Sequence, residues 1–221
     1  MKTFLMDLQS IFINPTLVND KFQNRYNLGT ITIYLFFVFV LFLLFGIIST
    51  IIHNNLNVSV PYSNLEISFV KAVLLAPLME EFCFRAFFKK SKINLLLFFI
   101  GLAYLICGYI YYCNWVFYYL ILIVLFGSYF FIIKKIDFSE PYNGKKLTIW
   151  VYLSCLIFGF SHIINYKVEF NSILFLFIIL FLKVCGAFFL MLLRLKFGLM
   201  YSILFHFFIN FLGFVLYMLD K

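Results

Sequence analysis

Three charged residues interrupt an apolar stretch of the chain, LLAPLMEEFCFRAFF at residues 74–88. They are Glu80, Glu81 and Arg85. A charge near the centre of a lipid bilayer costs from ~2.5 to over 10 kcal/mol, so each of them needs a partner. On a helix, Glu81 and Arg85 are neighbours at i and i+4 and are predicted to form an ion pair. Glu80 lies about 100° around the helix from Glu81. The spacing therefore predicts that Glu81 and Arg85 support a site in which Glu80 is the working group.

Two further motifs place histidines in apolar stretches. FGFSH ends at His162, and HFFIN runs from His206 to Asn210, again with i, i+4 spacing. Polar groups inside membranes usually pair with one another or mark a functional site. If the helix that carries Glu80 continues to Lys92, a rise of 1.5 Å per residue places Glu80, His162 and His206 roughly 18, 22 and 15 Å from one membrane surface. If it ends at Phe88, Glu80 is only about 12 Å from that surface, and the match with His162 worsens. The three motifs are expected to meet in one layer near the middle of the membrane.

A carboxylate, two imidazoles and an amide in a protected cavity suit the hydrolysis of an amide bond. Glu80 would act as general base on a water that His162 helps to hold, while His206 and Asn210 donate hydrogen bonds to the developing oxyanion. Alternatively, Glu80, His162 and His206 would hold Zn²⁺ or another divalent metal, with water as the fourth ligand. The residue types leave both arrangements open.

The composition identifies the elements that must carry these residues. Of 221 residues, 65% are hydrophobic and only 12% are charged, and the mean hydropathy is +1.06. Soluble domains are about 45–50% apolar and about 25% charged. Several apolar runs reach the ~20 residues that cross a bilayer as a helix. The sequence predicts an all-α, polytopic membrane bundle of seven helices, at about 29–52, 67–88, 94–113, 114–133, 147–165, 171–193 and 197–218.

The basic residues follow these spans. They gather before the first span and after the second, fourth and sixth. The positive-inside rule then predicts a multi-pass cell-membrane protein with a cytoplasmic N-terminus and an outer C-terminus. This distribution explains the net charge of +8 without a nucleic-acid partner. Lys183 lies deep in the sixth span, and the sequence suggests no role for it.

The chain is predicted to have a cytoplasmic N-terminal segment, residues 1–28, followed by a single membrane domain, residues 29–221. The motifs occupy a core at about 65–215. The third and fourth spans, about 94–133, are separated by a very short turn and are expected to form a peripheral helical hairpin.

The ordered motifs EExxxR, FxxxH and HxxxN on separate helices resemble those of the CPBP family, the CAAX-protease and bacteriocin-processing (Abi) group of intramembrane proteases. This group includes the type II CAAX prenyl endopeptidases. The resemblance implies that Glu80 is the catalytic carboxylate and His162 its partner on the water. His206 and Asn210 would complete the site, with Glu81 and Arg85 as supports. It also implies a membrane-associated or prenylated protein or peptide as substrate, and either a metalloprotease or a metal-free glutamate mechanism.

The chain departs from the family pattern at two points. Ala86 stands where glycine often follows the motif arginine, and the gap between the first two motifs is longer by about one hairpin. Other protease types fit poorly, because the chain has no HExxH and no GxGD. Ser161 and His162 are adjacent and diverge on a helix, which disfavours a serine nucleophile. Two other functions stay open: a non-catalytic membrane scaffold or immunity protein, and an ion-coupled transporter.

Overall fold

The computed structural model describes residues 68–110, 115–138, 144–165 and 173–219, with scattered positions before residue 48. The described chain is helical, and no strand occurs in it. Its elements are η1 (Val70–Leu75), α4 (Ala76–Arg85), η2 (Ala86–Phe88), α5 (Lys92–Ile110), α6 (Trp115–Lys135), α7 (Gly144–Ser161), η3 (His162–Asn165), α8 (Ile173–Phe197) and α9 (Leu199–Leu219). The prediction of an all-α fold is confirmed for these residues.

Among the described residues, two helical segments are long and apolar enough to cross a membrane, Leu176–Phe197 and Leu199–Leu216. The predicted first span, 29–52, lies outside the described residues apart from scattered positions, as does most of the predicted segment 1–28. The turn expected between the third and fourth spans also lies outside them.

A proline stands where the helical register changes before α4. η1 is a π-helix, in which the N–H of Ala76 donates to the carbonyl of Lys71, five residues back. Pro77 follows in the first turn of α4, and proline has no N–H with which to continue the series. Short π-helical segments are rare and often occur at functional sites. The helical run therefore changes its hydrogen-bonding pattern just before the three charged residues.

The helical run ends with η2 at Phe88, the end predicted for the second span, and does not continue to Lys92. The chain leaves the α-helical conformation at Arg85, where φ is −131°. Side chains from other helices bond to the final carbonyls: Ser154 Oγ of α7 donates to Phe84 O at 2.6 Å. Arg194 Nε of α8 donates to Arg85 O at 2.9 Å. These donors take the place of the N–H groups that a further helical turn would supply.

Two helix ends bear on the predicted depths. Because the helical run ends at η2, Glu80 lies about 12 Å from that end, the shallower of its two predicted depths. The sequence also placed Arg194 and Lys196 in a polar segment after the sixth span. They lie within α8 and are only 5% and 9% exposed. Gly198, with φ of 105°, ends α8 by donating its N–H to the carbonyls of Leu193 and Arg194. A glycine with positive φ is the usual residue at this kind of helix end.

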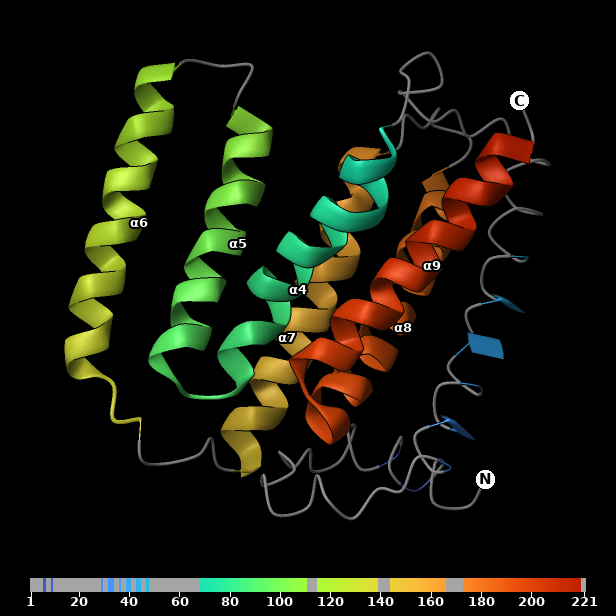
Figure 1. Ribbon diagram of the computed structural model, residues 1–221, viewed down its shortest axis with the longest axis horizontal. Helices are drawn as coiled ribbons and strands as arrows, with labels where there is room; N and C mark the ends of the chain where they lie inside the picture. The colour runs from blue at the N-terminus through green and yellow to red at the C-terminus, as the bar shows by residue number, and fades with distance from the viewer. Residues whose placement is uncertain are drawn as a thin grey trace.

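The motif-bearing helices form the compact part of the bundle. α4 packs against α5, α9 and α7, and α8 packs against α7 and α9 (Figure 1). Two glycines allow close approach between helices. A Cβ on Gly101 of α5 would lie 2.5 Å from the carbonyl oxygen of Met79, and one on Gly159 of α7 would lie 2.8 Å from the nitrogen of Val184. The buried core centres on α8, where Leu190, Met191, Leu192 and Leu193 are at most 2% exposed.

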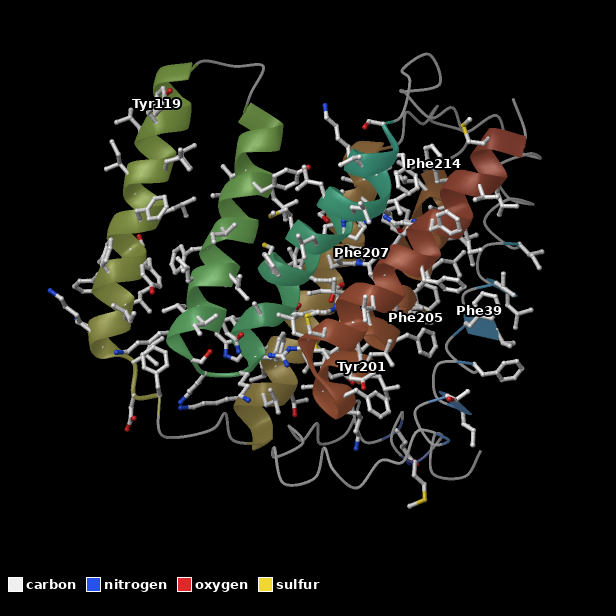
Figure 2. All side chains as sticks on the ribbon, in the orientation of Figure 1. Phe39, Tyr119, Tyr201, Phe205, Phe207 and Phe214 are labelled. Carbon is white, nitrogen blue, oxygen red and sulfur yellow. The ribbon has the colours of Figure 1, made fainter. Side chains whose placement is uncertain are left out.

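α5 and α6 stand side by side, with α6 at the edge of the molecule (Figure 1). α6 packs on α5. Its Ile123 and Val124 are 68% and 64% exposed. Figure 2 shows Tyr119 near one end of this helix, whereas Tyr201, Phe205 and Phe214 follow α9 on the opposite side of the bundle.

Candidate functional site

The predicted ion pair on α4 is present. Arg85 Nη1 donates to Glu81 Oε1 at 2.5 Å, and the two side chains are 1% and 0% exposed. The guanidinium also donates through Nη2 to Ala187 O at 3.3 Å and lies over the ring of Phe158, with Cζ 4.8 Å from the ring centroid. A buried ion pair is stable only when further hydrogen bonds satisfy both groups. Arg85 meets this condition in part: it bonds Ala187 O of α8 and lies over the Phe158 ring of α7, while its buried Nε has no hydrogen-bond partner among the described residues.

α9 presents a polar stripe to α4, composed of Ser202, His206 and Asn210 at i, i+4 and i+8. Ser202 Oγ donates to Glu81 Oε2, and His206 Nδ1 lies 2.9 Å from Glu81 Oε1. Glu81 is therefore held by three side chains from two helices. Sequence reasoning assigned Glu81 to Arg85 alone and missed Ser202, although the i−4 position from His206 carried the signal.

His206 bridges the two carboxylates. With Nδ1 directed at Glu81, the other ring nitrogen, Nε2, lies 3.6 Å from Glu80 Oε2. When the ring hydrogen is on Nδ1, it donates to Glu81 Oε1, which also accepts from Arg85. The lone pair of Nε2 then faces Glu80. The Glu80 side chain is 20% exposed, against 0% for Glu81. Of the two carboxylates, Glu80 is the one that an entering molecule can reach.

Phe158 lies between the two histidines. Its ring centroid is 4.9 Å from that of His162 and 5.9 Å from that of His206. His162, the first residue of η3, places Nδ1 2.8 Å from Phe158 O. This bond leaves Nε2 for another partner. Within the described part of the chain, His162 forms no ion pair or hydrogen bond with Glu80, so the ring of Phe158 and not a direct bond joins the two motifs.

Asn210 contacts η1, the helical segment that precedes the carboxylates of α4. Its Nδ2 donates to Ala72 O in η1 at 2.9 Å. One amide hydrogen is thus committed to the backbone, and the second remains for a further acceptor. The polar stripe of α9 therefore bonds to the α4 run at two levels, the carboxylates and η1.

Lys183 of α8 acquires a context that the sequence did not suggest. It interacts electrostatically with both Glu80 and His162, and it is partly buried. Lys71, at the start of the run, is exposed. A cation near a reactive carboxylate favours its ionised form. Lys183 thus adds a positive charge on the side of the site where His162 lies.

The donor chemistry fits a metal in part. A histidine that binds a metal commonly directs its other ring nitrogen to a carboxylate, as His206 does toward Glu81. Glu80 Oε2 and His206 Nε2 are near neighbours. However, no group of three His, Cys, Asp or Glu side chains gathers at metal-binding geometry among the described residues. His162, the third predicted ligand, does not join Glu80 and His206 in such a group.

The chain matches no protein-family model, no curated protein and no solved structure.

Proposed function

We propose that this chain is an intramembrane endopeptidase, of the kind that the CPBP-like motifs imply. The observation that carries the proposal is the bonded series Arg85–Glu81–His206 with Glu80 at its accessible end, buried in an apolar helical bundle. A buried series of this kind keeps a histidine oriented and leaves one carboxylate for a proton transfer.

In this function Glu80 takes a proton from a water whose oxygen attacks the carbonyl carbon of a peptide bond. The proton then passes to the leaving amine nitrogen, so that acid and amine products form. His206, once it carries a proton at Nε2 as well, and the free hydrogen of Asn210 donate to the oxyanion, and His162 holds the water through its own Nε2.

The proposed setting is a cell membrane, crossed seven times with a cytoplasmic N-terminus and an outer C-terminus. Support comes from the two helical segments long and apolar enough to cross a membrane and from the distribution of basic residues. The proposed substrates are membrane-associated or prenylated proteins and peptides, because a site inside the bilayer is reached from the lipid phase.

A divalent metal, if bound, would be held by Glu80, His206 and His162 and would supply an activated water. Metal analysis of the purified protein, combined with chelation, distinguishes the two mechanisms. Loss of cleavage on chelation, with recovery on adding Zn²⁺, supports the metal mechanism. Full cleavage by metal-free protein supports glutamate-activated water.

The test compares new protein N-termini in membranes from cells that express wild-type protein, Glu80→Gln or His206→Ala. Peptide N-termini present only with the wild type identify the cleaved substrates, and a synthetic peptide spanning the cut confirms them with purified protein. Lys71→Met is the matched control, since Lys71 is an exposed charge on the same helical run. If both site variants keep full biological activity, the endopeptidase is excluded and a scaffold remains. Ion flux in liposomes without cleavage would instead indicate a transporter.

A further inference from the structure

The carbonyl of Ala72 lacks the donor that its helix would normally supply. At the end of η1, the N–H of Ala76 bonds Lys71 O, five residues back. The next bond in this series would run from residue 77 to Ala72. Residue 77 is proline, which has no N–H. A buried carbonyl without a hydrogen bond is costly, so Ala72 needs a donor from elsewhere.

Asn210 supplies that donor. Its Nδ2 lies 2.9 Å from Ala72 O, where the N–H of residue 77 is missing. Two aromatic contacts hold the same ends of η1 and α9 together. Phe69 packs edge-on against Phe211 and Phe214, with ring centroids 6.3 and 5.3 Å apart. A side chain of α9 thus completes the backbone bonding of the helix that carries the carboxylates.

This bond lies one helical turn along α9 from the contacts of His206. His206 approaches Glu80 at 3.6 Å and Glu81 at 2.9 Å, and Asn210 bonds Ala72. The two helices are therefore joined on both sides of Pro77. Loss of the Asn210 bond would let η1 shift and would change the distance between Glu80 and His206.

We propose that Asn210 is a positioning residue: its amide replaces the hydrogen-bond donor that Pro77 lacks, and this bond holds the helix of Glu80 in place against His206. The consequence for catalysis rests on the proposed endopeptidase function. The bond itself does not, and the two parts are tested separately.

The first test measures thermal unfolding of purified protein in detergent for Asn210→Leu, Pro77→Ala and the double variant. Leucine removes the donor without adding charge, and alanine at 77 restores a backbone N–H to the helix. Asn210→Leu is expected to lower the melting temperature by about 3 °C, and the double variant is expected to recover most of this loss. Pro77→Val, which keeps a volume near that of proline, repeats the rescue if the alanine variant folds poorly. Asn94→Leu is the matched control, since Asn94 donates an exposed amide bond to Lys89 O. Pro77→Ala should not compensate that substitution.

The second test measures kcat and KM on the peptide found in the membrane comparison. Asn210→Leu is expected to lower kcat at least tenfold with little change in KM, and Pro77→Ala/Asn210→Leu is expected to restore the part of kcat lost through positioning, while the part due to the missing oxyanion donor stays lost. A double variant as slow as Asn210→Leu overturns the positioning role and shows that Asn210 acts on the reacting carbonyl alone. If the wild type gives no cleavage product that is absent from the Glu80→Gln variant, the proposed function is wrong. The melting temperatures still test whether Asn210 replaces the donor that Pro77 lacks. If the losses of the two single variants simply add in the double variant, that role is refuted.

Discussion

The motif-bearing part of the bundle and the α5–α6 hairpin differ in what they bury, although α8 and α9 are as apolar in sequence as α5 and α6. In the motif-bearing part, charged side chains are enclosed: Glu81, Arg85 and Arg194 are 0%, 1% and 5% exposed. In α6, apolar side chains are exposed instead, with Ile123 at 68%. An apolar surface needs no internal partner in lipid, whereas a buried charge requires several.

The two regions also meet their neighbours differently. α5 contacts α4 backbone to backbone at Gly101, whereas nothing lies within 4 Å of a Cβ built on Gly127 of α6. The hairpin therefore has a tight inner helix and a loosely held outer one. The comparison indicates that specific packing is concentrated in the helices that carry the motifs, with α5 as their boundary.

The largest expected effect separates the two adjacent carboxylates. Glu80→Gln should reduce peptide cleavage about a thousandfold and leave the melting temperature nearly unchanged, because Glu80 is partly exposed and forms no tight bond. Cleavage of the synthetic peptide and thermal unfolding measure the two quantities on the same sample. A Glu80→Gln variant that still cleaves the peptide would contradict the prediction that the motif-bearing helices, unlike the hairpin, carry the catalytic carboxylate.

Glu81→Gln should affect stability first. It removes the charge that balances buried Arg85 and weakens the bonds from Ser202 and His206, so it should cost about 3–5 kcal/mol of unfolding free energy. Denaturant unfolding measures this loss. Equal stability of the Glu80→Gln and Glu81→Gln variants would contradict the assignment of Glu81 as the structural carboxylate.

A glycine pair tests the boundary within the hairpin. Gly101→Ala should cost about 1–3 kcal/mol of unfolding free energy, because the new methyl group meets the backbone of α4. The methyl group of Gly127→Ala meets no neighbour within 4 Å. The second substitution should be neutral or slightly stabilising, since alanine is the better helix former by about 1 kcal/mol. Similar losses in both variants would show that α6 is packed as closely as α5.

The smallest expected effect lies on the outer face of α6. Ile123→Ala should change the unfolding free energy by no more than about 0.5 kcal/mol in detergent and should not alter cleavage. Thermal unfolding and peptide cleavage again provide the measurements. A loss of several kcal/mol would reveal that another part of the molecule covers this face.

Local spacing carried the sequence predictions that succeeded. The Glu81–Arg85 pair follows from i, i+4 geometry, which is the same in any α-helix. The same geometry places His206 and Asn210 on one face of α9. Apolar composition predicted an all-helical chain, because helices satisfy their own backbone groups.

Residue spacing in the sequence could not predict the contacts between helices. The sequence did not show that His206 lies closer to Glu81 than to Glu80, because this depends on how two helices are rotated against each other. Nor did it show that α4 ends at Arg85, since the carbonyls there are capped by Ser154 and Arg194 from distant parts of the chain.

The motif residues and their local pairings can thus be read from the chain, since a helix dictates which neighbours share a face. Their division into a braced carboxylate and an accessible one is a property of the folded bundle. It depends on where other helices place Ser202, Phe158 and Asn210 against Glu81, His206 and Ala72. Helix rotation and depth follow from side-chain packing between segments far apart in sequence, and no local pattern encodes that packing.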